Sequence, residues 1–204
     1  VDSAEIVFLC VLPQQAEEVV SQLRFQQGQE VASVIATVTA ENLAAWIGVP
    51  VQITRAIPLP SVADHRGVTA VYPANTLLEE LFYGMGTVIA APSLDAFDSY
   101  AVASSTMATY FGILETISEW MQSQGSDADG AKAYLDNLFL GLANTSAEAR
   151  DHSYSQLQVG HATPGGLNEQ VFRVFSAEGG KDALMAGLES VAARVHAARG
   201  LERS

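Results

Sequence analysis

The sequence of 204 residues contains a single cysteine, Cys10, which excludes an intramolecular disulfide and a cysteine-rich metal site. Because Cys10 lies in the apolar run Ile6–Val11, we predict that its thiol is a small buried hydrophobic group. Long apolar runs are missing too, since none approaches the roughly 20 residues that cross a bilayer. The first residues also lack the layout of a secretory signal. We therefore predict a cytoplasmic protein with no membrane partner.

Positive charge is scarce as well. The chain has 10 basic and 23 acidic side chains, which give a formal net charge of -13 and a pI near 4.5. Lys132 and Lys181 are its lysines, and no basic run occurs. Because a phosphate-backbone partner requires clustered Lys and Arg, this composition argues against nucleic-acid binding.

Several familiar site motifs are missing. Gly84-Met85-Gly86 supplies two glycines of a dinucleotide fingerprint, but position 89 is isoleucine. The segment also runs from a predicted helix into a predicted strand, which is the reverse of the required order. No phosphate-binding loop or nucleophile elbow occurs. The histidines are scattered and form no spaced cluster with Asp or Glu, so we predict no metal site.

The sequence does contain enough apolar residues for a substantial core, because 49% of it is apolar and only 16% is charged. Over the first ninety residues, β-branched apolar runs alternate with segments of helical period. The predicted strands are 6–11, 31–36, 51–57, 68–72 and 87–91, and the predicted helices are 15–23, a helix between the N-cap Thr39 and Gly48, and 76–83. This alternation predicts βαβ units and an α/β fold with a partial Rossmann-like parallel sheet.

Parallel sheets of this kind bind ligands beyond the carboxyl ends of their strands. Leu12-Pro13-Gln14 follows the first predicted strand directly, so it is a candidate ligand contact. The alternative is that Pro13 only ends the strand and sets the turn into the next helix.

From residue 93 onward the strand-like runs stop. The predicted helices are 94–122, 128–143, 146–156, 164–178 and 180–198. We therefore divide the chain into a sheet domain, 1–92, and an all-helical domain, 93–204. Residues 131–142 are apolar on most sides of their helix, which predicts burial in a core or against a second subunit. Because few other helices are present to cover this helix, we predict a homodimer.

The segment His161–Gln170 is the most informative part of the helical region. We predict that Thr163 is an N-cap with Pro164 at the first helical position. Gly165 and Gly166 would then expose backbone N–H groups at the positive end of the helix, which suits a carboxylate or another anion. An ordinary capped helix with a flexible start explains the same residues equally well.

Five segments stand out together: Val11–Gln14, Arg55–Ser61, Thr69–Pro73, Ser104–Tyr110 and Thr163–Asn168. In this order, over nearly the whole chain, they resemble Val-Lys-Pro-Gln, Arg-x-Met-Pro-Asn-Thr-Pro, Thr-Ala-Leu-Tyr-Pro, Ser-Gly-Ser-Gly-Pro-Ala-Tyr and Ser-Pro-Gly-Gly-Thr-Thr. These are motifs of the pyrroline-5-carboxylate reductase family, and by this resemblance we identify the chain as a member.

The resemblance implies hydride transfer from NADP or NAD, in reduced form, to a cyclic imine, which converts 1-pyrroline-5-carboxylate into L-proline. It implies that 1–92 is the remainder of a dinucleotide-binding Rossmann domain and that 93–204 is a dimerisation and substrate domain. By the same resemblance, cofactor contacts are Val11, Leu12, Pro13 and Gln14. Substrate contacts are Ser104, Ser105, Thr163, Gly165, Gly166 and Leu167, and the catalytic positions are Asn168 and Thr106.

The departures from the family motifs bear on activity. Leu12 replaces a lysine, Leu59 an asparagine, and Leu167-Asn168 two threonines. Asn168 stands where the family has its best candidate proton donor, and a carboxamide cannot act as a general acid. We therefore hypothesise that the substrate or the activity has drifted within the reduction of imines and small carbonyl compounds, with a reductase of this family as the leading interpretation. The alternatives are a reductase for another substrate and a non-catalytic dimeric protein that keeps the helical domain.

The start of the chain carries one more expectation. It begins at Val1 without methionine and enters a predicted strand within five residues, so we expect that sequence upstream has been lost. Residues 1–204 alone are then predicted to bind NAD(P)H weakly and to be inactive. The choice between NADH and NADPH stays open, as does any assembly larger than a dimer.

Overall fold

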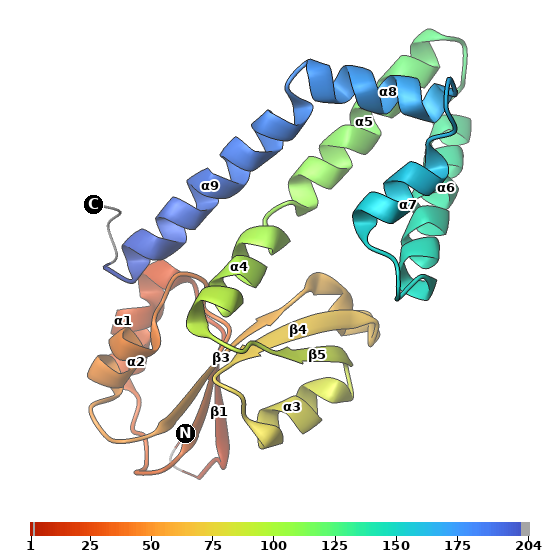
Figure 1. The fold of residues 1–204 in the computed structure, drawn as a ribbon. Coiled ribbons are helices and arrows are strands. Elements are labelled where there is room, and N and C mark those ends of the chain that lie inside the picture. Colours follow the sequence, from red (N-terminus) through yellow and green to blue (C-terminus); the bar gives the residue numbers. More distant parts are fainter. Residues whose placement is uncertain (2, 201–204) are drawn as a thin grey trace. The chain divides into compact units, whose positions relative to one another are not determined.

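The computed structural model describes residue 1 and residues 3–200 (Figure 1). Its strands are β1 (Ile6–Leu9), β2 (Glu30–Ser33), β3 (Gln52–Pro58), β4 (Gly67–Tyr72) and β5 (Gly86–Ala90). Its helices are η1 (Pro13–Gln15), α1 (Ala16–Gln22), α2 (Ala40–Ile47), η2 (Pro60–Asp64), α3 (Thr76–Tyr83), α4 (Leu94–Ser104), α5 (Met107–Ser123), α6 (Ala128–Glu148), α7 (Tyr154–His161), α8 (Leu167–Ala177) and α9 (Gly180–Ala198). The chain packs as a sheet unit, formed by residues 1–105 and the chain from 188 onward, and a helical unit, residues 106–187.

The strands lie in one sheet in the order of the sequence, β1-β2-β3-β4-β5. β1, β2 and β3 are parallel, β4 is antiparallel to β3, and β5 is parallel to β4. The connection from β3 to β4, which contains η2, is shorter than the crossover of about a dozen residues that parallel neighbours need. The predicted α/β fold with a mostly parallel sheet is confirmed. Because β2 and β3 are parallel, their carboxyl ends meet at one edge of the sheet.

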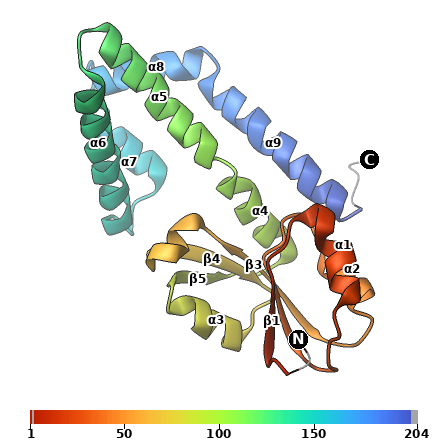
Figure 2. The same cartoon turned by 180° about the vertical axis from the view of Figure 1, so that it is seen from behind.

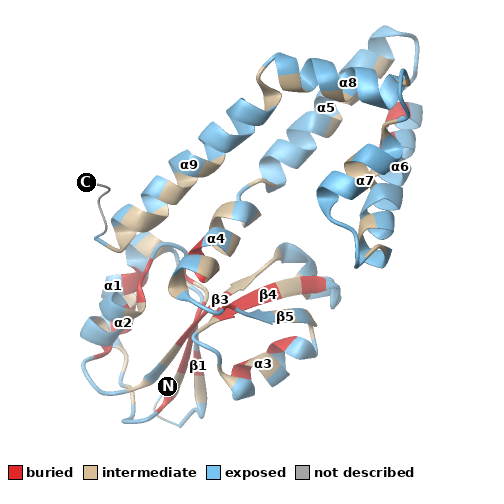
Figure 3. Cartoon of the chain, in the orientation of Figure 1, coloured by how far each residue is buried: buried red, intermediate tan, exposed pale blue. Residues whose placement is uncertain are grey.

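Helices cover both faces of this sheet, with α1 and α2 on one side and α3 on the other (Figures 1 and 2). Val31 of β2 packs in the core beneath α1 and α2, whereas its neighbour Ala32 packs in the core beneath α3. Both residues are fully buried, because successive strand residues point to opposite faces. Figure 3 shows that the buried residues of the sheet unit gather in the strands and in the helix faces against them.

The prediction of a buried Cys10 is wrong, because this residue is exposed. Strand β1 ends at Leu9 and alternates: Val7 and Leu9 are buried, whereas Phe8 is 38% exposed. Cys10 follows just past the strand and shares the parity of Phe8. On this side of β1, Phe8 contacts Phe82 edge-on and stays partly exposed, and Cys10 lies beyond the end of the strand in an exposed position.

Local capping signals explain why the short helices begin and end where they do. Thr39 caps α2 in a capping box with Asn42, and Gly48 ends the helix at a left-handed φ of 72°. Asn75 caps α3 by accepting a hydrogen bond from the Leu78 N–H at 3.2 Å. The predicted cap at Thr39 and the predicted helix 76–83 are therefore confirmed.

The predicted single helix 94–122 is wrong, because α4 ends at Ser104 and α5 begins at Met107. The Ser104 and Ser105 hydroxyls donate to the carbonyl oxygens of Ala101 and Val102, at 2.8 and 2.6 Å. Serine and threonine side chains that bond to the preceding turn bend or interrupt helices, and Ser104, Ser105 and Thr106 place three hydroxyls in a row.

The predicted helix 146–156 is wrong as well. Helix α6 continues to Glu148, and α7 starts only at Tyr154. Ser153 caps α7 in a capping box with Gln156, which fixes the start of α7 eight residues later than predicted.

The packing of α4 differs from the sequence-based division at residue 93. Phe97 of α4 is 1% exposed and shares a core with Ala70 and Ala91 of the sheet unit, so α4 packs as part of that unit. The domain boundary at 92/93, drawn from the change in sequence pattern, stays a prediction. In the described part of the chain, every helix is too short or too polar to cross a bilayer.

Candidate active site

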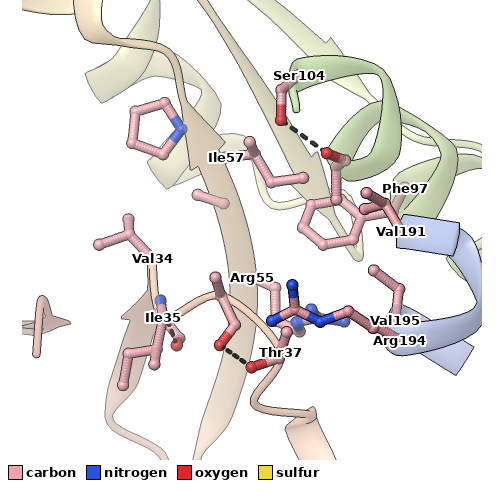
Figure 4. A pocket seen from close by; sticks show the side chains of 15 residues that line it. Val34, Ile35, Thr37, Arg55, Ile57, Phe97, Ser104, Val191, Arg194 and Val195 are labelled. Carbon is pink, nitrogen blue, oxygen red and sulfur yellow. Dashed lines mark hydrogen bonds between the residues drawn. The ribbon is translucent and has the colours of Figure 1, made fainter. Parts of the chain in front are cut away.

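A cavity of about 440 Å³ lies in the sheet unit at the carboxyl ends of β2 and β3 (Figure 4). Two of its walls are the segments Ser33–Thr37 and Arg55–Pro58, which end these parallel strands. α4 and the last turns of α9 form the others. The cavity therefore occupies the edge at which sheets of this class bind ligands.

The turn after β2 shapes one wall of the cavity. Thr37 has a φ of 63°, which a β-branched residue rarely adopts. Its hydroxyl donates a hydrogen bond to the Ala36 carbonyl oxygen at 2.6 Å. This turn brings the chain from β2 to Thr39, the cap of α2, so a strained residue lines the cavity between two well-formed elements.

The walls are mainly apolar and carry a few polar groups. The apolar side chains come from four elements or their adjoining loops and include Val34, Ile35, Ile57, Phe97, Val191 and Val195. Ser104 and Thr37 line the cavity with hydroxyl hydrogens already committed to carbonyl oxygens. To a ligand these two side chains therefore offer lone pairs, while the guanidinium groups of Arg55 and Arg194 offer donors.

A buried ion-pair network borders the cavity. Asp98 of α4 is 2% exposed, and its Oδ2 accepts a hydrogen bond from Arg199 Nη1 at 2.9 Å. Its Oδ1 lies 3.6 Å from Arg55 Nη1, and the Arg55 guanidinium lies over the Phe97 ring at 4.8 Å. Arg199 also donates to Asp95 Oδ1 at 2.8 Å. The network ties β3, α4 and the segment directly after α9 together beside one wall of the cavity.

The network shifts the ionisation of its members. Burial lowers the pKa of the Arg55 guanidinium, while Asp98 and Glu41 act in the opposite direction. Arginine nevertheless stays protonated in proteins. The hydrogen bond from Arg199 lowers the pKa of Asp95, and the same bond raises the pKa of Arg199. Arg55 Nε and Asp98 Oδ1 are buried atoms without a hydrogen-bond partner in the described residues.

The predicted cofactor contacts lie at the carboxyl end of β1. Pro13 and Gln14 form η1 with Gln15, and Leu12 before them is 64% exposed. Val11 packs partly against the core beneath α1 and α2. None of the four residues from Val11 to Gln14 lines the cavity.

The predicted substrate residues on the long helix fall at the break between α4 and α5. Ser104 lines the cavity, whereas Ser105 is an exposed cap residue of α4. Thr106 is the N-cap of α5 and the first residue of the helical unit. Of the three neighbours, the cavity thus receives Ser104 alone.

The predicted site at the start of α8 has a different local structure from the one expected. The N-cap is Gly166, and α8 begins at Leu167, so the predictions of a cap at Thr163 and of a helix from 164 are wrong. The Thr163 carbonyl accepts from the Gly166 N–H at 2.8 Å in a turn that Gly165 completes with a φ of 74°. Proline and glycine together favour this turn over the helix.

Two side chains close that turn. Glu169 Oε2 accepts a hydrogen bond from the Gly165 N–H at 2.6 Å. Asn168 Nδ2 donates to the His161 carbonyl oxygen at 2.9 Å, which joins the start of α8 to the end of α7. The backbone donor that was expected to meet an anion therefore already has a carboxylate.

Sequence reasoning assigned no role to Arg55, Asp98, Arg194 and Arg199. Arg55 did carry a signal, because a charged residue inside a predicted apolar strand must find a partner when the strand is buried. Asp98 and Arg194 stand in helical segments and Arg199 directly follows one, and there the sequence does not mark which polar side chains meet in the fold. In the described residues, no three His, Cys, Asp or Glu side chains gather as metal ligands.

Comparison with curated proteins finds two relatives, which match over similar numbers of residues at the same identity. The chain is 25% identical over 202 residues to pyrroline-5-carboxylate reductase 2 of Bacillus subtilis, covering 93% of the chain and 71% of that protein. It is 25% identical over 193 residues to pyrroline-5-carboxylate reductase of Aquifex aeolicus, covering 90% and 71%.

Solved structures agree with this fold. The pyrroline-5-carboxylate reductase of Coxiella burnetii matches with a TM-score of 0.79 at 25% identity, covering 99% of this chain and 77% of that one. The enzyme of Streptococcus pyogenes matches with a TM-score of 0.82 at 17% identity, covering 96% and 77%. That of Plasmodium falciparum, solved with NADP bound, matches with a TM-score of 0.79 at 17% identity, covering 95% and 77%.

A family model, pyrroline-5-carboxylate reductase dimerisation, matches residues 94–198. This segment makes up more than half of the chain and contains α4 to α9. The chain therefore belongs to the pyrroline-5-carboxylate reductase family.

Proposed function

We propose that this protein is an NAD(P)H-dependent oxidoreductase that reduces the C=N bond of a small cyclic imine, with 1-pyrroline-5-carboxylate and L-proline as the substrate and product to test first. Family membership supports this class of reaction. The observation that carries the proposal is the cavity at the carboxyl ends of β2 and β3. A related imine or small carbonyl compound is the second choice, because Leu12, Leu59 and Asn168 depart from the family motifs.

The residues of the cavity fit a nicotinamide ring beside a small cyclic substrate. Its volume of about 440 Å³ lies within the range of small-molecule sites. Val34, Ile35 and Ile57 supply apolar walls for a flat ring, and Ser104 and Thr37 supply acceptors for amide or iminium N–H groups. When bound, NADPH or NADH supplies a hydride to the imine carbon, which leaves NAD(P)+ and moves the C=N π electrons to a protonated ring nitrogen.

Ser104 is the proposed contact for the ring nitrogen. Its hydroxyl hydrogen points to the Ala101 carbonyl oxygen, so its lone pairs are available to an iminium N–H. The other substrate contacts proposed from the family resemblance are Ser105, Thr163, Gly165, Gly166 and Leu167. Val11, Leu12, Pro13 and Gln14 are the corresponding proposals for the cofactor.

Asn168 and Thr106 hold the catalytic positions in the family resemblance. For Asn168 we propose a positioning role, because its amide donates to the His161 carbonyl oxygen and a carboxamide has no proton to give near neutral pH. The proton on the ring nitrogen then comes with the substrate as its iminium form, or from solvent.

A homodimer is the proposed assembly. Tyr134, Leu138 and Leu142 follow one another at four-residue spacing along α6, and each is more than 40% exposed in the single chain. Residues at this spacing share one helix face, so α6 presents a continuous apolar stripe. The matched family model is a dimerisation domain, which supports a second copy as the cover of this stripe.

The first test mixes purified protein with 1-pyrroline-5-carboxylate and millimolar NADPH, and measures NADPH oxidation by absorbance and proline by amino-acid analysis. High cofactor concentration is needed because residues 1–204 alone are predicted to bind NAD(P)H weakly and to be inactive at the cofactor concentrations of an ordinary assay. The reason is that the sequence contains no glycine-rich strand–turn–helix for the pyrophosphate.

Ala101→Trp is the matched variant, because Ala101 lines the cavity and the indole would fill it. We expect proline to form with the parent protein and not with this variant, while both remain folded by circular dichroism. A folded dimer that consumes NADPH with none of a panel of small cyclic imines would instead support the non-catalytic alternative.

A further inference from the structure

The last turns of α9 form a wall of the cavity without a buried side chain to anchor them. The cavity-lining residues of this helix are Val191, Arg194 and Val195, and α9 contains no buried residue. Other walls have cores of their own, since Ile35 after β2 is 4% exposed and Phe97 of α4 is 1% exposed. Burial of apolar groups is the main force that fixes an element on its neighbours. Because α9 lacks it, another attachment must hold this wall in place.

Arg199, directly after α9, supplies such an attachment. Its Nη1 donates hydrogen bonds to Asp98 Oδ2 at 2.9 Å and to Asp95 Oδ1 at 2.8 Å, and both acceptors belong to α4. The Arg199 side chain is 17% exposed and that of Asp98 is 2% exposed. Hydrogen bonds between charged groups are about twice as strong as neutral ones, and a buried carboxylate keeps water from competing. The two bonds therefore hold the end of α9 against α4.

Arg199 also determines how Asp98 faces the strand side of the cavity. Asp98 Oδ1 lies 3.6 Å from Arg55 Nη1, too far for a hydrogen bond, and Oδ1 has no hydrogen-bond partner in the described residues. Arg199 thus donates a hydrogen bond to this buried carboxylate, whereas Arg55 places an opposite charge near it. Without Arg199, the carboxylate would turn toward Arg55, which lines the cavity on β3. Arg199 therefore acts on two walls at once.

The bond between Arg199 and Asp98 lies behind the wall and not in the cavity. The residues that surround the cavity include neither of these two. In Figure 4, the α9 side chains Val191 and Val195 lie on the side of the cavity opposite Ile35. A ligand between these side chains would touch the wall that Arg199 holds and would not touch Arg199 itself.

We propose that Arg199 is a positioning residue of the candidate active site. By binding Asp98 and Asp95, it keeps the last turns of α9 closed on the cavity. Its loss opens this wall and weakens the binding of a small ring there. The closed wall is a property of the fold, and only the identity of the ligand, a cyclic imino acid, rests on the proposed function.

Thiol accessibility tests the wall without any ligand. Cys10→Ser removes the single cysteine of the chain, and Ser104→Cys then places one thiol on the cavity wall. Ser105→Cys is the matched control, because Ser105 is exposed and does not line the cavity. The reagent is iodoacetamide, which is small and uncharged, and the intact mass followed over time gives the alkylation rate.

Arg199→Gln is the decisive change in both cysteine backgrounds. We expect it to raise the alkylation rate of S104C at least about tenfold, the effect of losing a charge-assisted hydrogen bond that opposes opening. The rate of S105C should not change. Arg199→Lys, which keeps the charge and loses the planar fork, should give an intermediate rate for S104C. An S104C rate that is the same with Arg199 and with R199Q would overturn the proposal.

Leu43→Ala separates opening of the wall from a general loss of stability. Leu43 is fully buried in the core beneath α1 and α2. L43A should therefore destabilise the fold and leave the alkylation rate of S104C close to its value with Leu43 under native conditions. A rise in L43A as large as in R199Q would mean that the thiol reports unfolding of the whole unit, and the proposal would fail.

Ligand binding gives the second readout, in the full chain with Cys10 and Ser104 intact. Isothermal titration calorimetry with L-proline should show at least about tenfold weaker binding in R199Q, with partial rescue in R199K. For the imine, KM should rise while kcat changes little, because Arg199 does not touch the reacting atoms. Unchanged L-proline affinity in R199Q would contradict the proposed effect of the wall on binding.

The proposed function and this inference fail in different ways. An S104C thiol that Arg199 protects, in a protein that reduces no cyclic imine, would leave the wall established and refute the proposed function. Imine reduction in which R199Q changes neither the KM nor the alkylation rate of S104C would leave the function standing and overturn this inference.

Discussion

The sheet unit and the helical unit differ in how they are stabilised. Of the buried apolar residues in the described chain, all lie in the sheet unit except Ala131 and Leu135. The helical unit instead exposes large side chains along its helices, among them Phe111, Trp120 and Val171, each more than 60% exposed. Since apolar burial is the main favourable term in folding, the sheet unit has its own core, whereas the helical unit has much apolar surface left for another chain to cover.

The cavity belongs entirely to the better-packed unit. Every residue that lines it lies in residues 1–105 or in the chain from 188 onward. Binding to the cavity and the proposed assembly through the stripe on α6 therefore depend on different residues. Variants can change one without the other, and the following predictions use this separation in order of decreasing effect.

The largest loss of stability is expected from Asp98→Ala in the sheet unit. Removing this buried carboxylate leaves Arg55 with a buried charge, a change that costs about 3–5 kcal/mol in the free energy of unfolding. Urea denaturation measures it. Asp95→Ala is the control, because Asp95 is an exposed partner of the same Arg199 and its removal should cost much less. Equal losses in the two variants would contradict the network described above.

A slightly smaller effect is expected from Leu43→Ala in the core beneath α1 and α2. Leu43 is fully buried, and replacing such a leucine with alanine costs about 2–5 kcal/mol because a cavity remains. Leu12→Ala removes the same atoms from a side chain that is 64% exposed and should change stability by less than about 0.5 kcal/mol. Thermal or urea denaturation of the two variants measures this difference. An L43A variant as stable as the parent protein would show that Leu43 is not packed in the core.

In the helical unit, replacing an apolar side chain should affect assembly more than the stability of the single chain. Leu138→Asp places a charge in the stripe formed by Tyr134, Leu138 and Leu142, and we expect the dimer dissociation constant to rise at least about a hundredfold. Analytical ultracentrifugation measures this constant. Leu77→Asp, in an exposed position of α3 in the sheet unit, is the matched control. An unchanged constant in L138D would exclude this stripe from the interface.

The smallest effect is a pH dependence of stability that originates in the sheet unit. Hydrogen bonding to its own backbone and to Thr39 lowers the pKa of Glu41 from 4.5, and the bond from Arg199 lowers the pKa of Asp95 from 3.8. Both groups thus contribute stability that is present above their unfolded pKa values and lost as the pH falls below them.

Unfolding midpoints measured from pH 6 down to about pH 3 test this dependence. E41Q and D95N should each make the unfolding midpoint fall less steeply as the pH is lowered. E115Q, which removes one exposed carboxylate from the helical unit, is the control. A decline as steep in E41Q and D95N as in the parent protein would contradict the assignment.

Much of the fold follows from signals a few residues long. The apolar runs predicted every strand of the sheet, and Thr39 and Asn75 provide caps for α2 and α3 through side chains adjacent to the helices they start. Prediction from local signals was wrong where two signals in one segment favoured different structures. Ser104 and Ser105 have hydroxyls that bond to the preceding turn, and this outweighed the helical pattern of residues 94–122.

The candidate site was less predictable than the fold. The family resemblance led to Ser104, which does line the cavity, and to Thr163–Asn168, whose turn and hydrogen bonds differ from those expected. A single side chain, Glu169, changes the electrostatics of that turn, and it lies outside the motif that carried the resemblance. The resemblance therefore mispredicted the local structure of this segment, while its role as a ligand site stays a prediction.

The amino-acid pattern alone was sufficient for the α/β class, the family and the order of the elements, because periodicity, capping and motif spacing are properties of neighbouring residues. The folded chain was needed to bring Arg55, Asp98 and Arg199 together from β3, α4 and the segment after α9. It was needed equally to turn Arg194 toward the cavity and Cys10 toward solvent. Which charges meet, and which side chain a strand leaves uncovered, depends on packing between distant segments, and no local pattern encodes it.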